Sequence, residues 1–406
     1  MVKNTAFAAL TLALLTGCGA VASLPDTASD TDNAAAANRI AQSSIIADTH
    51  IDVPYRLEEN AADISAATKD GDFDYPRAVR GGLNVAFMSI YTPAELEADG
   101  GSYEVAESLI DKVEDLVAQS PDKFAIARSV EDVREQFKAG LISLPLGMEN
   151  GSPIEGDLKN IQHFYDRGIR YITLTHSLSN HISDSSYDDH RQWDGLSEFG
   201  FDVVREMNRL GMMIDVSHVS DAAFWQIMVT SKVPVIASHS SSRHFTPGFE
   251  RNMNDEMIVA LAKRGGVIQI NFGSSFISQA TRDYSNARAA ARKQYLARHP
   301  DLREEDIYRS FAESYAAEHG PFPFATLDEV LDHFDHVVSL VGIDHVGIGS
   351  DYDGVGDSLP IGLKDVASYP NLVQGLLERG YDEADIVKIL GENLLRVWQA
   401  VEDHAS

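Results

Sequence analysis

Eight short apolar segments recur along this chain, with helical patterns between most of them, and this alternation restricts the possible folds. The segments are residues 45–48, 83–91, 141–148, 171–175, 212–216, 233–238, 266–272 and 345–349. Residues 102–118, 196–210 and 255–262 carry apolar side chains at helical spacing. Strands that alternate with helices pair in parallel, and eight of them can close into a barrel. We therefore predict an α/β fold, a (β/α)8 TIM-type barrel. The alternative is an open doubly wound sheet, but no glycine-rich dinucleotide fingerprint follows the first segment.

One connection is much longer than the others. Residues 279–319, between the seventh and eighth predicted strands, are rich in charge and favour helix. We predict a helical insertion there. It is either a solvent-exposed excursion, or a lid or subunit contact.

The N-terminus has the pattern of a secretory signal. A lysine at position 3 precedes an apolar run, residues 5–15, that is too short to span a bilayer. The run ends in Leu-Thr-Gly-Cys, which resembles the lipobox of bacterial lipoproteins. In that class the peptide is cut before the cysteine, here Cys18, which is then acylated. The alternative is an ordinary signal peptide with an incidental cysteine.

The remaining N-terminal features suggest a location and a domain plan. Glycine rather than aspartate follows Cys18, which by resemblance favours the outer membrane. We expect a protein of the bacterial cell envelope, lipid-anchored and facing the periplasm. The segment after the cysteine is rich in Ala, Ser, Thr and Asp and has no apolar period. The predicted plan is a signal peptide (1–17), a flexible tether (18–40) and a barrel domain (41–406).

Charge and cysteine content exclude several kinds of protein. The formal net charge of −29 argues against nucleic acid or an anionic membrane surface as a partner. Cys18 is the only cysteine, so the chain has neither an internal disulfide nor a Cys-x-x-Cys metal or redox site.

Polar side chains recur just beyond the apolar part of several predicted strands. They are His50 and Asp52 (first strand), Glu149 (third), His176 (fourth), His218 (fifth), His239 (sixth), and Asp351 and Asp353 (eighth). Any one of these histidines alone could be a core or loop residue. Because a barrel builds its active site from the carboxyl ends of its strands, together they predict a functional site.

The composition of this set indicates metal binding. Three imidazoles (His50, His218, His239) and two carboxylates (Asp52, Glu149) exceed the needs of one tetrahedral catalytic zinc. They suit two metals bridged by Glu149. Such mixed ligation favours zinc, and less exclusively manganese or iron. Two metals about 3.5–4 Å apart can share a hydroxide and polarise a carbonyl.

Several longer motifs carry a family resemblance. They are DTHID (48–52), RGGLNVAFMSIYTP (80–93), GLSEFGFDVVREMNRLGMMIDVSHVSD (195–221), HVGIGSDYDG (345–354) and GENLLRV (391–397). Over residues 45–400 the chain resembles the renal (membrane) dipeptidase family, a branch of the metal-dependent barrel hydrolases. The resemblance implies a dizinc enzyme that hydrolyses L,L-dipeptides, tolerates a D-residue at the C-terminal side, and forms a homodimer.

The same resemblance assigns the metal ligands. It implies that His50 and Asp52 bind one zinc ion. His218 and His239 would bind the second, with Glu149 as the bridge.

It also implies three roles toward the substrate. His176 would contact the substrate and steady the oxyanion of the tetrahedral intermediate. Arg251 would bind the free carboxylate of the dipeptide, and Asp351 would handle proton transfer to the leaving amine. Asp353 shares a face with Asp351, so the choice between these two acids rests on the resemblance.

Two other functions fit parts of the pattern. Another binuclear-metal hydrolase, such as an amidase or lactonase, would often begin with His-x-His and use a modified lysine as the bridge. The sequence His50-Ile51-Asp52 and the candidate bridge Glu149 disfavour that class. A non-catalytic binding lipoprotein on the same scaffold predicts a gap in the ligand set, and the sequence has none.

Overall fold

The computed structural model describes residues 27–405, together with Met1. The rest of the predicted signal peptide (1–17), Cys18 and the start of the predicted tether lie outside the described residues.

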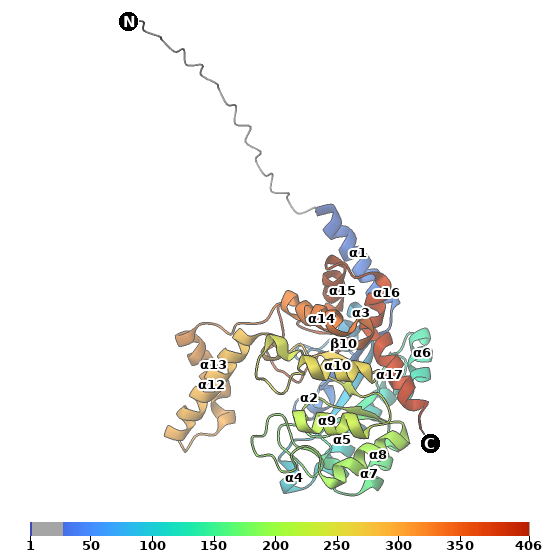
Figure 1. Cartoon of the computed structure of the whole chain (residues 1–406), viewed down its shortest axis with the longest axis vertical. Coiled ribbons are helices and arrows are strands. Elements are labelled where there is room, and N and C mark those ends of the chain that lie inside the picture. Colours follow the sequence, from blue (N-terminus) through green and yellow to red (C-terminus); the bar gives the residue numbers. More distant parts are fainter. Residues whose placement is uncertain (2–26, 406) are drawn as a thin grey trace.

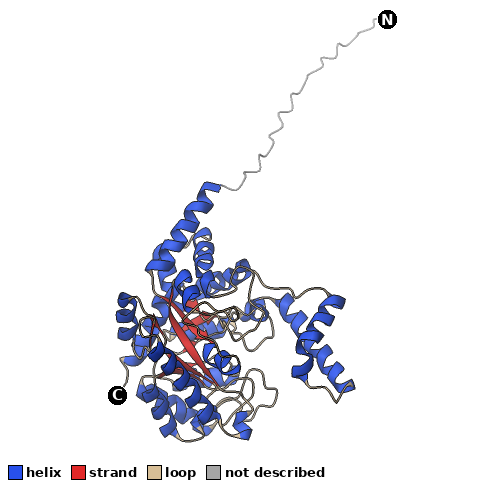
Figure 2. Ribbon diagram, turned by 180° about the vertical axis from the view of Figure 1, so that it is seen from behind, coloured by secondary structure: helices blue, strands red, loops and turns tan. Residues whose placement is uncertain are grey.

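Eight parallel strands form a closed barrel at the centre of the molecule. They are β1 (Ile46–Ile51), β2 (Leu83–Tyr91), β5 (Leu146–Glu149), β6 (Ile169–Thr173), β7 (Met213–Asp215), β8 (Ile236–Ala237), β9 (Val267–Ile270) and β10 (Val346–Ile348). Strand β1 pairs with β2 on one side and with β10 on the other, which closes the ring. Figure 2 shows the strands enclosed by helices. The predicted (β/α)8 barrel is confirmed.

The third predicted strand, residues 141–148, differs in the structure. It is split into β4 (Ile142–Ser143) and β5, with Leu144 and Pro145 between them. Proline has no N–H for a strand ladder, which explains the interruption. Strand β4 pairs with β2 and with the short strand β3 (Phe124–Ala125), so a small extension leaves the barrel at this point.

Helices surround the barrel, except for one pair that extends away from it. They are α1 (Thr27–Ser43), α2 (Val53–Glu59), α3 (Tyr75–Gly81), α4 (Leu96–Asp99), α5 (Ser102–Gln119), α6 (Val130–Ala139), α7 (Leu158–Arg167), α8 (Glu198–Leu210), α9 (Asp221–Thr230), α10 (Asp255–Lys263), α11 (Ser274–Ile277), α12 (Gln279–Arg298), α13 (Glu304–His319), α14 (Leu327–Val341), α15 (Tyr369–Glu378), α16 (Glu383–Val387) and α17 (Asn393–Glu402). Side-chain caps define several starts: Ser197 accepts the Gly200 N–H, and Asn254 accepts the Met257 N–H. The three predicted helices correspond to α5, α8 and α10.

The predicted insertion is confirmed as the helices α12 and α13. They lie between β9 and β10 and extend away from the barrel as a pair (Figure 1). At the base of the pair, the Tyr284 hydroxyl donates to the carbonyl of Gly320 at 2.8 Å.

The predicted tether, residues 18–40, is wrong for its final part. Residues 27–43 form helix α1, which lies against α15 (Figure 1). Ala37, Ile40 and Ala41 are buried there. This buried stripe consists mostly of alanines, which are strong helix formers but give a weak hydrophobic period. Within the described part of the chain, no helix combines the length and apolar character needed to cross a bilayer.

The amino-terminal end of the barrel is filled, which leaves the site at the opposite end. Phe87 of β2 contacts Tyr171 of β6 and Trp398 of α17, with ring centroids 5.5 and 5.4 Å apart. All three side chains are fully buried. The polar residues that follow the strands therefore gather at the carboxyl ends, where the barrel has space for them.

Candidate metal centre and active site

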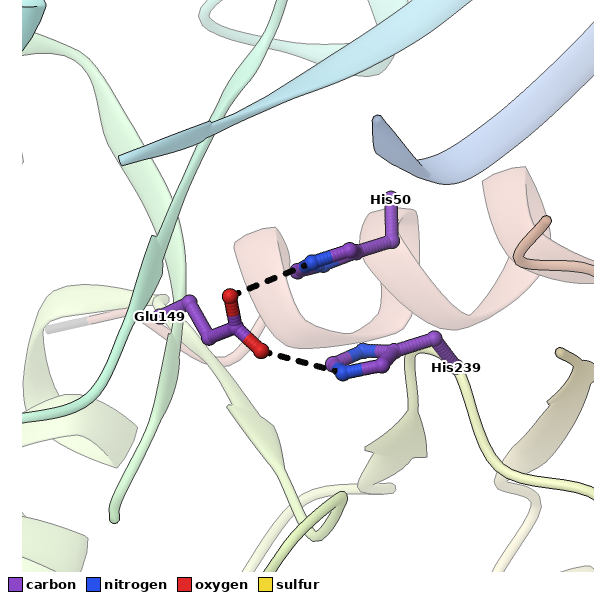
Figure 3. A group of neighbouring side chains, drawn as sticks. All are labelled: His50, Glu149 and His239. Carbon is purple, nitrogen blue, oxygen red and sulfur yellow. Dashed lines mark ion pairs between the residues drawn. The ribbon is translucent and has the colours of Figure 1, made fainter. Parts of the chain in front are cut away.

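The five predicted ligands converge around one carboxylate. Glu149, the last residue of β5, places Oε1 3.1 Å from Nε2 of His218 and 3.2 Å from Nε2 of His239. Its Oε2 lies 3.4 Å from Nε2 of His50, and that nitrogen is also 3.4 Å from Oδ2 of Asp52. Figure 3 shows His50 and His239 directed at the two oxygens of Glu149.

The proton of His50 is placed by Tyr171. The Tyr171 hydroxyl donates to the carbonyl of Thr49 at 2.9 Å, so its oxygen accepts from Nδ1 of His50, also at 2.9 Å. Nε2 of His50 is buried without a hydrogen-bond partner and faces the carboxylates of Glu149 and Asp52. A lone pair facing carboxylate oxygens is unfavourable unless a cation lies between them.

His239 is oriented in a comparable way from the other side. Its Nδ1 lies 2.7 Å from the hydroxyl of Ser238, and its Nε2 lies 3.0 Å from Nε2 of His218. His218 has a φ of 68°, an uncommon backbone conformation for a residue with a side chain. Such strain is found where the surrounding structure holds a functional side chain in position.

The pKa shifts show that two of the three imidazoles in this cluster stay neutral, whereas the groups beside His50 favour its charged form. Burial lowers the pKa of His218 and of His239 well below the ordinary value, which keeps both imidazoles neutral. Burial also lowers the pKa of His50, but Tyr171, Glu149 and Asp52 together raise it well above that value. Neutral imidazoles beside carboxylates are suited to divalent metals.

At this end of the barrel, three overlapping groups of ligand atoms are compact enough to hold an ion. The groups are His50, Glu149 and His239; Glu149, His176 and His218; and His50, Asp52 and Asp351. Within each group the candidate atoms lie within 4.8 Å of one another. All five predicted ligands take part, and Glu149 belongs to two groups. His176 and Asp351, predicted to act on the substrate, lie at the edge of the same cluster.

Asp351 and Asp353 have different environments, which separates their roles. Asp351 accepts the side-chain N–H of Asn271 on Oδ2 at 2.7 Å. Burial, together with the charge of Asp52, raises its pKa to about 7. Asp353 instead accepts from Arg56 at 2.9 Å. It is therefore engaged in a structural ion pair, and Asp351 is the acid that belongs to the cluster of candidate ligands.

A glycine makes room for these carboxylates. A side-chain carbon at Gly354 would lie 2.1 Å from Oδ2 of Asp52 and 2.3 Å from Oδ1 of Asp351. Only a residue without a side chain allows the loop after β10 to approach them so closely.

Arg251 is a buried cation at the same end of the barrel. It donates to the hydroxyl of Ser240 at 2.7 Å and to the carbonyl of His239 at 2.8 Å, and its Nε has no partner. Only 2% of its surface is exposed. No ion pair to Arg251 occurs among the residues whose side chains the structure describes. Its guanidinium is thus available to an anion in the adjoining cavity.

A cavity of about 730 Å³ opens over the cluster. Its wall includes His176, whose ring meets Tyr91 edge-on with centroids 4.9 Å apart. Other lining residues are Tyr55, Tyr187, Phe276 and Tyr308. Tyr308 belongs to α13, so the helical insertion contributes to the wall. The volume is in the range of small-molecule binding sites.

Several residues that hold the site in place are not among those predicted from the sequence. Tyr171 positions His50, Asn271 positions Asp351, and Asp215 accepts the Ser238 hydroxyl at 2.6 Å. Tyr171 and Asp215 lie inside predicted strands, where nothing distinguishes them in the sequence from residues without a role in the site. A polar side chain on the buried face of a barrel strand is the signal that could have identified them.

A parallel barrel with clustered imidazoles and carboxylates at its carboxyl end defines a metal-dependent barrel hydrolase. The family described as membrane dipeptidase (peptidase family M19) matches residues 34–406. The chain belongs to this family and is a dipeptidase-like metallopeptidase.

Individual relatives agree with the family match. An uncharacterized dipeptidase of Schizosaccharomyces pombe is 32% identical over 372 residues, covering 88% of this chain and 80% of the relative. The crystal structure of the probable dipeptidase PvdM from Pseudomonas aeruginosa has a TM-score of 0.80 and 27% identity, covering 92% of this chain and all of that one. A metallopeptidase of Rhodobacter sphaeroides, solved with a phosphinate mimic of L-Ala-D-Ala, has a TM-score of 0.72 and 25% identity, covering 88% and 100%.

Proposed function

We propose that the protein is a dizinc dipeptidase that hydrolyses dipeptides with a free C-terminal carboxylate, of both L,L and L,D configuration. The observation that carries this proposal is the position of Arg251: a buried guanidinium with an unpartnered Nε lines the cavity beside the metal cluster. A planar guanidinium pairs well with a carboxylate. The mimic of L-Ala-D-Ala bound by the Rhodobacter sphaeroides relative supports the inclusion of L,D-dipeptides.

The candidate ligands would hold two zinc ions, one on each side of Glu149. His50 and Asp52 would hold one, and His218 and His239 the other. When bound, two such metals supply an activated water and polarise the carbonyl under attack. Nε2 of His50 fits this assignment, because it faces the two carboxylates without a hydrogen-bond partner while Tyr171 occupies Nδ1.

The protein's own groups would orient the substrate and move the proton. Arg251 would hold the C-terminal carboxylate, and His176 would stand over the carbonyl oxygen and steady the oxyanion. Asn271 occupies Oδ2 of Asp351, which leaves Oδ1 to carry a proton from the attacking water to the leaving amine. An acid with a pKa of about 7 can both accept and release a proton near neutral pH.

A substrate panel tests this function. We expect purified protein to hydrolyse L-Ala-L-Ala and L-Ala-D-Ala, and to hydrolyse tripeptides, simple amides and lactones at least about a hundredfold more slowly in kcat/KM. The physical reason is that Arg251 would bind the C-terminal carboxylate and so fix how far the end of the substrate lies from the metals. Faster turnover of a lactone or a simple amide than of any dipeptide would instead support the amidase or lactonase alternative.

We further propose that Cys18 is acylated and holds the enzyme at the outer membrane, on the periplasmic side. The lipobox-like Leu-Thr-Gly-Cys supports this. Each buried CH₂ of an acyl chain contributes about 0.8 kcal/mol to membrane binding, and more than one chain gives stable attachment. Mass spectrometry of the mature N-terminus is expected to show a lipid-modified Cys18. An unmodified N-terminus on soluble periplasmic protein would contradict the proposal.

A further inference from the structure

We propose that Asp215 is a positioning residue that acts through Ser238 to keep the proton of His239 on Nδ1, so that Nε2 faces the metal cluster unprotonated. This inference rests on the proposed metal centre. It assigns a role to a buried carboxylate outside the predicted ligand set.

Asp215 accepts four hydrogen bonds. It is the last residue of β7 and is fully buried. Its Oδ1 accepts the backbone N–H of Ser217 at 3.0 Å and that of Ser238 at 2.7 Å. Its Oδ2 accepts the hydroxyls of Ser238 at 2.6 Å and Thr173 at 2.5 Å. With four donors directed at it, this carboxyl acts purely as an acceptor.

The direction of these hydrogen bonds determines the tautomer of His239. Because the Ser238 hydroxyl gives its proton to Asp215, its oxygen accepts from the ring nitrogen 2.7 Å away. Nδ1 of His239 therefore carries the proton, and Nε2 presents its lone pair beside Oε1 of Glu149, 3.2 Å away. A second hydrogen bond that sets the tautomer also increases the strength of an imidazole as a metal ligand.

Replacing Asp215 by asparagine should reverse this arrangement with little change in shape. The two backbone N–H groups at Oδ1 need an acceptor, so the amide oxygen must take that place. The amide nitrogen then faces the Ser238 oxygen and cannot accept its proton. The hydroxyl is left to donate to Nδ1 of His239, which moves the ring proton to Nε2, the nitrogen that would bind metal.

This reversal predicts an unusual double-mutant result. The experiment measures the affinity of each zinc in the full-length protein by competition with a chromophoric chelator. Asp215→Asn should weaken one of the two zinc ions by about 10–100-fold, and Ser238→Ala should weaken the same ion less. The double variant Asp215→Asn/Ser238→Ala lacks the Ser238 hydroxyl that would donate to Nδ1 of His239. Zinc should therefore bind more tightly to it than to Asp215→Asn alone.

Matched variants separate this effect from general disruption. Thr173→Val removes another hydroxyl from Oδ2 of Asp215 without touching His239, and we expect zinc affinity within about twofold of wild type. Circular dichroism and thermal unfolding of the metal-free variants report on folding. If Asp215→Asn does not fold, Ser238→Thr, which keeps the hydroxyl, should retain the affinity that Ser238→Ala loses.

The zinc affinities of these variants decide whether Asp215 positions His239. Wild-type affinity in Asp215→Asn, or losses that simply add in the double variant, would overturn the role of Asp215 and leave the metal centre intact. Equal zinc affinity in Ser238→Ala and Ser238→Thr would also overturn it. A wild-type protein that binds no zinc at all would overturn the proposed function, and this inference with it.

Discussion

Glu149→Gln is expected to lose both zinc ions and at least about a thousandfold of kcat/KM for dipeptides, which corresponds to roughly 4 kcal/mol of transition-state stabilisation. The two oxygens of Glu149 face Nε2 of His50 on one side and Nε2 of His218 and His239 on the other. An amide keeps only one acceptor oxygen and places an N–H₂ group against imidazole nitrogens. Both halves of the proposed centre should therefore be weakened by this one change.

Glu59→Gln is the matched control for this prediction. Glu59 lines the same cavity but lies outside the groups that could hold a metal. The control should keep its metal and remain within a few-fold of wild-type activity. Metal content and initial rates are measured on the same preparations. A Glu149→Gln protein that keeps two metals per chain and turns over within tenfold of wild type would rule out Glu149 as the bridge.

Arg251→Met should lose about a hundredfold or more in kcat/KM on free dipeptides and much less on C-terminally amidated dipeptides. Breaking a buried ion pair costs about 3–5 kcal/mol, because the remaining charge is left without a partner. Arg251 is buried, and its free Nε adjoins the cavity, so a substrate carboxylate there would be such a partner. An amidated end carries no charge, so the wild-type enzyme should already treat it as a poor substrate.

Four values of kcat/KM decide the role of Arg251: two enzymes, each with one acid and one amide substrate. Arg282→Met is the control, since it removes a nearby guanidinium that stacks on Phe249 and is absent from the cavity wall. This control should change acid and amide substrates by the same factor. Equal losses on both substrates in Arg251→Met would show that Arg251 does not recognise the carboxylate.

The barrel and the convergence of the candidate ligands could be predicted because they depend on local patterns. Short apolar runs in the sequence predict buried strands. Polar side chains directly after such strands must meet at one end of a closed barrel. His50, Glu149 and His239 were identified in this way, although they lie on β1, on β5 and after β8.

The supporting residues could not be predicted because their partners are distant in the chain. Tyr171 reaches His50 across the barrel from a strand 121 residues away, and no local pattern encodes that contact. Asp353 and Asp351 look equivalent in the sequence, and their partners separate them: Arg56 pairs with Asp353, and Asn271 donates to Asp351. Helix α1 could not be predicted for a different reason: its buried side consists mostly of alanines, so the segment resembles a low-complexity tether.

Zinc titration of metal-free protein, with dipeptide hydrolysis followed at each step, tests the central claim most directly. The claim is that the cluster around Glu149 holds two metals which together support peptide hydrolysis. We expect no turnover after chelation, and activity that rises until two zinc ions are bound per chain. Full activity in metal-free protein, or full activity once a single zinc ion is bound, would contradict this account.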